Sequence, residues 1–174
     1  LLVADSLTGQ DAVRTAAAFH ERWPYFAPLL PHLLGTLSLA EGRRDLTAAA
    51  AHFAAQLSIC ETAHGGDPLW RAELAHLWEP AVFSHGLSRL MARDGAAAIA
   101  SFEKLISRDA PAGSLAALGR HDPGLAVQAR IQLGSALIQT RRPQDAARVL
   151  EDVRGEAAEV HHPAIDALLA RCRS

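Results

Sequence analysis

Apolar residues recur with a helical period along most of the chain. Between residues 10 and 23 they return every three or four positions, as they do in an amphipathic helix. Residues 25–40 are too apolar for a surface helix, so we expect that helix to be buried on more than one face. Proline and glycine separate these segments, because proline lacks the backbone donor and glycine favours turns. No segment alternates apolar and polar residues with a period of two. The pattern therefore predicts an all-α fold.

The breaks group the predicted helices into antiparallel pairs. Short polar turns lie at residues 41–44 and 93–95, whereas the looser stretch at residues 109–122 separates two pairs. Asp45, Asp67 and Asp122 each precede a helical segment, where an aspartate side chain accepts backbone N–H groups as an N-cap. Pro80 should kink or break its helix. We expect one domain over residues 1–174, with hairpins at about 26–64, 67–108 and 122–160 and a terminal helix at 163–173.

Small and large residues repeat at matched spacing in these hairpins. Ala98 and Phe102 follow Gly86 by 12 and 16 residues, and Ala146 and Leu150 follow Gly134 by the same intervals. In the first hairpin, Ala49 and Phe53 follow Gly35 by 14 and 18 residues, as if two residues had been inserted in the turn. Small residues let two helices approach closely. We expect the large residue to fill the gap to the next hairpin.

This spacing resembles the tetratricopeptide repeat, whose hairpins carry leucine-glycine in the first helix and alanine followed by an aromatic in the second. Leu34-Gly35 and Leu133-Gly134 match the first signature, whereas His85 replaces the leucine before Gly86. The glycines are separated by 51 and 48 residues, compared with roughly 34 in the standard repeat. Residues 67–75 resemble the long-period arrays attached to bacterial serine/threonine kinases and winged-helix regulators. The resemblance implies hairpins stacked as a right-handed α-solenoid.

The resemblance also implies a concave groove lined by the first helix of each hairpin, where a peptide or protein partner binds. For Phe83, Leu87 and Met91, packing against a neighbouring helix is an equally good interpretation. The lysine and asparagine clamp that some family members use on a peptide carboxylate is absent. The residues expected in the groove are His32, Thr36, Phe83, Leu87, Met91, Gln128, Ser135 and Gln139.

Composition and charge argue against two classes of partner, nucleic acids and membranes. The net charge of −2 and the pI near 6.5 argue against nucleic-acid binding, which needs a clustered basic surface. No apolar run is long enough to span a bilayer, so we expect no membrane partner. The two cysteines form no paired motif, which favours the reducing cytoplasm. Because the chain begins without methionine, we expect it to be a fragment of a longer protein.

Candidate chemistry is sparse. The nine histidines form no HExxH or Cys/His zinc spacing, so we expect no metal site. Glu79 and its neighbour Glu73 are better interpreted as solvated charges than as a catalytic pair, and no nucleophile motif is present. Trp70 and Trp78 could stack on a ligand but are more typical of a core. We therefore expect no catalytic residues and no cofactor.

Together these features favour a non-catalytic protein–protein interaction or sensory module of a larger bacterial protein. The alternative is a structural helical spacer, or a self-association domain, of a multidomain signalling protein or regulator.

Overall fold

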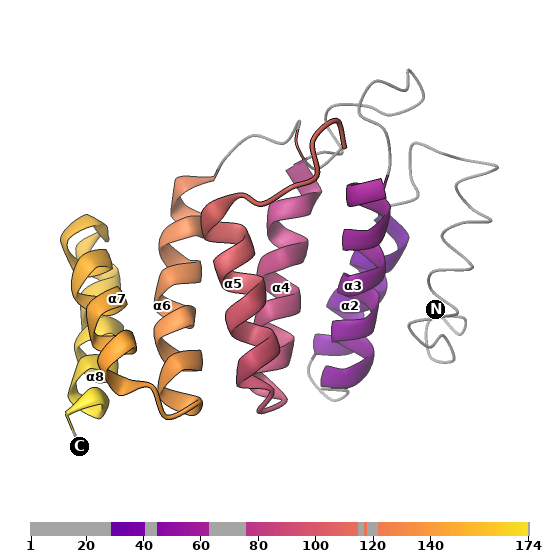
Figure 1. The fold of residues 1–174 in the computed structure, drawn as a ribbon. Helices are drawn as coiled ribbons and strands as arrows, with labels where there is room; N and C mark the ends of the chain where they lie inside the picture. Colours follow the sequence, from indigo (N-terminus) through magenta and orange to yellow (C-terminus); the bar gives the residue numbers. More distant parts are fainter. Residues whose placement is uncertain (1–28, 41–44, 63–75, 115–116, 118–121, 174) are drawn as a thin grey trace.

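The computed structural model describes residues 29–40, 45–62, 76–114, 117 and 122–173, and this part of the chain is all-α (Figure 1). No strand occurs among these residues, which confirms the predicted fold class. The helices are α2 (Leu29–Leu39), α3 (Leu46–Thr62), α4 (Trp78–Met91), α5 (Gly95–Ser107), α6 (Pro123–Gln139), α7 (Pro143–Glu156), the short 3-10 helix η4 (Glu159–His161) and α8 (His162–Cys172).

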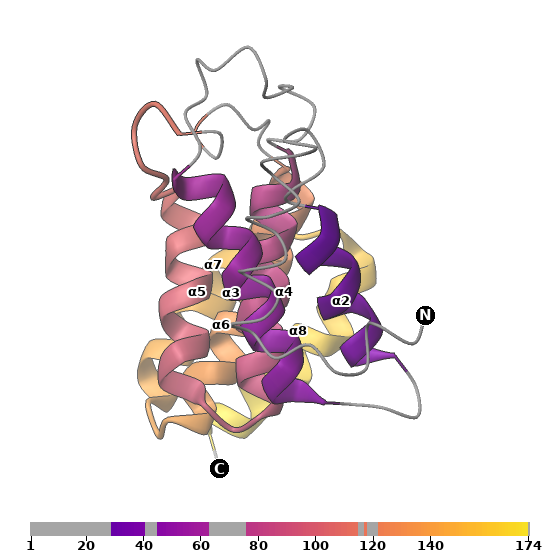
Figure 2. The same ribbon diagram turned by 90° about the vertical axis from the view of Figure 1, so that its right-hand side faces the viewer.

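Each described helix packs against the next one in the sequence, from α2 to α8. The helices lie roughly parallel and antiparallel to one another in a row, with α2 and α3 at one end and α7 and α8 at the other (Figures 1 and 2). Alternate helices also touch, because α4 contacts α6 and α6 contacts α8. The hairpins α2–α3, α4–α5 and α6–α7 therefore stack side by side along the chain.

Aspartate caps set the starts of three helices. The Asp45 carboxylate accepts the Ala48 N–H at 2.9 Å, and that of Asp94 accepts the Ala97 N–H at 3.2 Å. Asp122 accepts two N–H groups, from Gly124 at 2.9 Å and Leu125 at 3.1 Å. The caps predicted at Asp45 and Asp122 are confirmed, whereas the one predicted at Asp67 lies outside the described residues.

The same close contact occurs in all three hairpins. A Cβ atom added to Gly35 would lie 2.8 Å from the Phe53 ring, one added to Gly86 would lie 2.8 Å from the Phe102 ring, and one added to Gly134 would lie 2.7 Å from Leu150. Only glycine leaves room for these large, fully buried side chains. The large residue therefore packs on the glycine of its own hairpin. Phe102 also shares a core cluster with α6, and Leu150 shares one with α8.

The buried side chains form several clusters along the row of hairpins, and Leu34 and Ala55 make a small separate cluster between α2 and α3. The largest cluster joins residues of α3, α4, α5, α6 and α7, and includes Trp78, Phe102 and Leu133. A second cluster joins α6, α7 and α8 around Leu150 and Ile165. Trp78 is 1% exposed, so its predicted place in the core is confirmed.

Some predicted boundaries were wrong. α4 begins at Trp78, so Pro80 lies in its first turn, where the missing N–H costs no helical hydrogen bond. The kink or break expected at Pro80 concerns a helix arriving from Asp67, and residues 63–75 lie outside the described part of the chain. The helix expected to end near Val160 ends at Glu156. The predicted terminal helix at 163–173 corresponds to α8, which begins at His162, and the His162 Nε2 lies 3.2 Å from the Ala157 carbonyl oxygen. The helix predicted at residues 10–23 lies outside the described residues.

Candidate functional site

All eight residues expected to bind a partner lie on the first helices of the hairpins. His32 and Thr36 are on α2, Phe83, Leu87 and Met91 are on α4, and Gln128, Ser135 and Gln139 are on α6. Since α4 contacts α6, the structure brings the last two groups next to each other. Their burial and hydrogen bonds divide them into residues that hold the fold together and residues that remain open to a partner.

The α2 residues are partly engaged within the fold. His32 Nδ1 lies 3.3 Å from Gln56 Oε1, and its ring meets the Phe53 ring edge-on with centroids 6.2 Å apart. The buried Gln56 in turn donates from Nε2 to the Leu77 carbonyl oxygen at 3.3 Å. This polar chain connects α2 through α3 to the residue that precedes α4. Thr36 is exposed and donates its hydroxyl to the His32 carbonyl oxygen.

The three α4 residues range from core to surface. Phe83 packs against the main core cluster, with its ring centroid 5.9 Å from that of Phe102. Leu87 is half-buried and does not belong to the side chains packed on that cluster. Met91 is 47% exposed. Phe83 therefore supports the core, whereas Leu87 and Met91 present apolar surface.

On α6, Gln139 has a role that the sequence did not indicate. Its Nε2 donates to the Leu90 carbonyl oxygen at 3.2 Å, which joins the end of α6 to the end of α4. Its Oε1 is buried, accepts no hydrogen bond and would lie 3.0 Å from a Cβ atom on Gly95. Gln128 is exposed and Ser135 is half-buried. Gln128 and Ser135 are therefore the more accessible of the α6 candidates.

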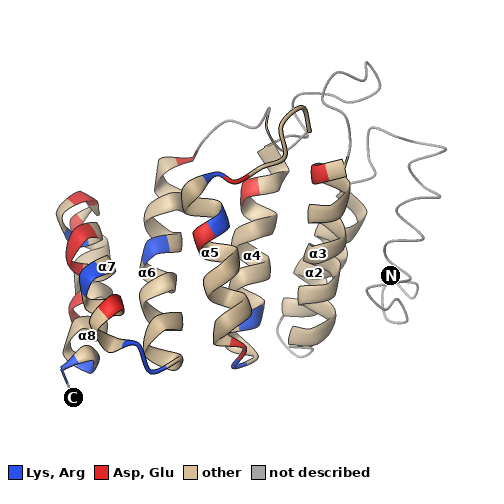
Figure 3. Ribbon diagram, viewed as in Figure 1, with Lys and Arg blue, Asp and Glu red and all other residues tan. Residues whose placement is uncertain are grey.

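The charged side chains on the first helices of the described hairpins form ion pairs with residues outside those helices. α2 carries none, and Figure 3 shows α4 and α6 almost free of red and blue. Arg89 pairs with Asp94 at 3.5 Å, and Arg130 pairs with Glu156 through two hydrogen bonds. The Gln128–Ser135 part of α6 and the Leu87–Met91 part of α4 consequently present polar and apolar surface with little free charge.

Glu79 was expected to be solvated, and this was wrong. It is 4% exposed, pairs through Oε1 with Arg108 Nε at 3.3 Å and accepts the Asp122 N–H through Oε2 at 2.9 Å. A buried carboxylate needs such partners to offset the loss of hydration. Because the partners are 29 and 43 residues away, no local sequence signal could have revealed this contact. Glu79 fixes both ends of the α5–α6 connection to the start of α4.

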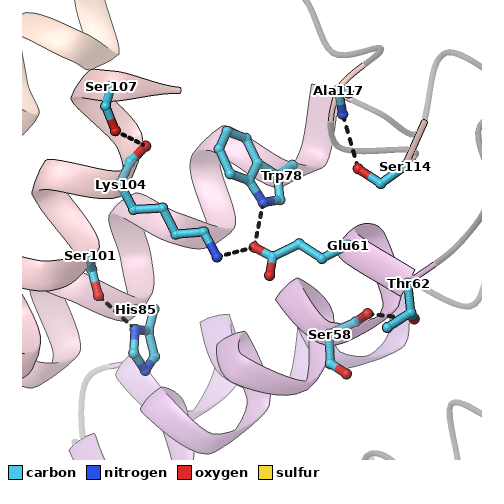
Figure 4. Close-up of polar contacts among 10 residues, drawn as sticks. All are labelled: Ser58, Glu61, Thr62, Trp78, His85, Ser101, Lys104, Ser107, Ser114 and Ala117. Atoms are coloured by element: carbon cyan, nitrogen blue, oxygen red, sulfur yellow. Dashed lines mark hydrogen bonds and ion pairs between the residues drawn. The ribbon is translucent and has the colours of Figure 1, made fainter. Parts of the chain in front are cut away.

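A second polar cluster joins α3, α4 and α5 (Figure 4). Glu61 Oε1 accepts the indole N–H of Trp78 at 2.9 Å and lies 2.6 Å from Lys104 Nζ. Nearby, His85 Nδ1 lies 2.9 Å from the Ser101 hydroxyl (Figure 4), and Arg89 donates to His85 Nε2 at 3.5 Å. Since Nε2 accepts from Arg89, Nδ1 carries the proton and donates to Ser101.

Burial shifts the pKa of three titratable groups on α3 and α4. Burial lowers the pKa of His85, and the adjacent Arg89 lowers it further. Burial likewise lowers the pKa of His52, which is 1% exposed and whose Nδ1 has no partner. Burial raises the pKa of Cys60 to about 12, so this thiol is protonated at neutral pH and is a poor nucleophile.

An open hollow of about 380 Å³ lies between α5 and the turn from α6 to α7. None of the eight expected residues lines it. The lining residues are Ala96, Ile99, Ala100, Glu103, Thr140 and Arg142.

In the part of the chain that the structure describes, no group of three or more histidine, cysteine or carboxylate side chains could hold a metal ion. The described helices are also too short or too polar to cross a membrane. Comparison of the chain with protein-family models, with curated proteins and with solved structures found no match.

Proposed function

We propose that the chain is a tetratricopeptide-like right-handed α-solenoid that serves as a non-catalytic interaction module of a larger bacterial protein. The observation that carries this proposal is the contact between a first-helix glycine and a large second-helix residue, which recurs in α2–α3, α4–α5 and α6–α7. Stacked units that repeat one contact are the hallmark of solenoid proteins, which bind partners on extended surfaces. The contacts of α4 with α6 and of α6 with α8 fit such stacking.

The proposed binding surface is the face of α2, α4 and α6 that carries Thr36, Leu87, Met91 and Gln128. Met91 supports this choice most strongly, because a large apolar side chain that is 47% exposed has contact area to offer a partner. The hollow beside α5 is the competing surface on the described residues. Its lining includes two charged residues, Glu103 and Arg142, and the apolar Ile99.

A pair of matched glutamate substitutions distinguishes these surfaces. Met91→Glu places a charge on the first-helix face, and Ala100→Glu places the same charge in the hollow at an exposed α5 position. The wild-type chain is used to select binders from random peptides displayed on phage, and the selected peptides are titrated against both variants. We expect Met91→Glu to weaken binding at least about tenfold, a loss of about 1.4 kcal/mol, and Ala100→Glu to leave it unchanged.

Thermal unfolding of both variants provides the control, because exposed positions should tolerate glutamate with little change in midpoint. Failure to select any peptide, or equal binding by wild type and Met91→Glu, would contradict the proposal. Loss of binding in Ala100→Glu alone would move the site to the hollow.

One observation favours the alternative of self-association. Leu33 is 58% exposed and Leu37 is 38% exposed, and both belong to α2. Neighbouring exposed leucines on one helix can pair with a second copy of the chain. Under this alternative, the double substitution of Leu33 and Leu37 by glutamate would convert a dimer to a monomer in light scattering.

A further inference from the structure

Two rows of side chains lie on the neighbouring helices α4 and α6. The apolar row consists of Leu87 and Met91, four residues apart on α4. The amide row consists of Gln128, Gln132 and Ser135 on α6. The two helices run in the same direction in Figure 1, contact each other, and are joined at their ends by the hydrogen bond from Gln139 to Leu90.

The amide row has unused hydrogen-bonding capacity. In the part of the chain that the structure describes, the side chains of Gln128, Gln132 and Ser135 make no hydrogen bond. Each glutamine amide offers two donors and one acceptor, and the serine hydroxyl offers both functions. This combination suits the N–H and C=O groups of a peptide backbone, which need both kinds of partner.

The spacing of both rows fits an extended chain. Residues four apart on a helix are separated by about 6 Å along its axis, and alternate residues of an extended strand are separated by about 6.6 Å. A strand lying along the two helices can therefore place every second side chain on the apolar row. Its backbone groups can meet the amide row at nearly the same interval.

The charged residues on these helices indicate which side chains a bound peptide can have. Among the described residues, α2 contains no charged side chain, and α4 and α6 contain only Glu79, Arg89 and Arg130. Glu79 is buried against Arg108, Arg89 pairs with Asp94 and Arg130 pairs with Glu156. A charged partner residue on this face would lose hydration without gaining a free counter-charge.

We infer that the partner contributes an uncharged, extended peptide segment, with apolar side chains on the α4 row and its backbone hydrogen-bonded to the α6 row. This inference rests on the proposed function, because it specifies the ligand of the same face. It separates the chain from modules that recognise a charged peptide end or an acidic motif.

The test uses the full chain and the peptides selected from the random phage library, synthesised with a fluorescent label. We expect the contacted stretch to lack Asp, Glu, Lys and Arg, and the dissociation constant to change by less than about twofold between about 0.05 and 0.5 M NaCl, since salt screens only charged pairs. Gln132→Ala should weaken binding about threefold to tenfold, as loss of a hydrogen bond does. The control Gln144→Ala, at an exposed position of α7, should not.

The outcomes separate this inference from the proposed function. If the selected peptides carry charges and bind less than one-fifth as tightly at high salt, while Met91→Glu still blocks them, the face binds a partner but the inference is overturned. Unchanged binding by Gln132→Ala would also overturn it, because the backbone would then not use the amide row. If Met91→Glu has no effect on the selected peptides, the proposed function and the inference both fail.

Discussion

Replacing Gly86 with alanine perturbs the contact that recurs in the three hairpins. The new methyl group would lie 2.8 Å from Cε1, 3.0 Å from Cζ and 3.1 Å from Cδ1 of Phe102. The Phe102 side chain is 0% exposed and also packs against Phe83. The ring cannot turn away without displacing its neighbours, because protein interiors are packed as densely as organic crystals.

The size of the effect follows from two opposing contributions. Adding a methyl group to a packed core costs about 1–3 kcal/mol, whereas replacing glycine by alanine inside a helix gains about 1 kcal/mol. Since three ring atoms would be crowded, we expect a cost in the upper part of that range and a net loss of about 1–2 kcal/mol. At Gly155, on an exposed turn of α7 with nothing within 4 Å, the same substitution should gain about 0.5 kcal/mol.

Urea denaturation followed by helical circular dichroism measures both free energies of unfolding. A second background tests the cause, because Phe102→Ala removes the ring that Gly86→Ala would crowd. In that background Gly86→Ala should stabilise the chain, so the sign of its effect reverses. The reasoning is refuted if Gly86→Ala stabilises the wild-type chain as Gly155→Ala does, or if its effect is the same in both backgrounds.

Three further predictions address the polar contacts and the oligomeric state. Glu79→Ala should lower the free energy of unfolding by about 2 kcal/mol in urea titrations, because the Asp122 N–H loses its acceptor. The control Glu156→Ala, at an exposed ion pair, should lower it less. Equal losses in the two variants would contradict the structural role of the buried Glu79 carboxylate. The free energy of unfolding should be highest above pH 6.5 and fall as the pH decreases below it. The lowered pKa of His52 and His85 keeps both side chains neutral in the folded state, while the same histidines take up protons in the unfolded chain. His85→Leu should reduce this pH dependence in urea titrations, and an unchanged slope would exclude His85 as its source. Light scattering over a range of concentrations should give a constant monomer mass, whereas a mass that rises with concentration would favour self-association.

The hairpins could be predicted because their signals are local. Glycine and the large residue 16 positions later, in α4–α5 and α6–α7, fix which helix faces pack together, and Asp45 and Asp122 mark helix starts through their own backbone neighbours. Even so, the spacing did not indicate that the large residue packs directly on the glycine of its own hairpin. Phe102 lies on the glycine of its own hairpin, because the missing Cβ of Gly86 is the space that admits the ring.

Contacts between distant residues could not be predicted in the same way. Glu79 is buried against Arg108 from the end of α5 and the Asp122 backbone from the start of α6, and neither partner is close to it in the sequence. Gln139 similarly looked like a groove residue, since its helical position matches that of Met91. The structure uses its amide to hold the Leu90 carbonyl, a role set by how closely α6 approaches α4. Gln132 was not singled out by the sequence, and only the placement of α6 beside α4 gives it a potential role.

Nuclear magnetic resonance mapping of a selected peptide on the isotope-labelled chain tests the proposed interaction most directly. Backbone amide shifts report which helices the peptide contacts, without any substitution that could alter the fold. We expect the largest shift changes at Leu87 and Met91 on α4 and at Gln128 and Gln132 on α6, with little change along the exposed faces of α5 and α7. Shift changes centred on Ala100 and Arg142, or none at saturating peptide, would contradict the assignment of the first-helix face as the binding surface.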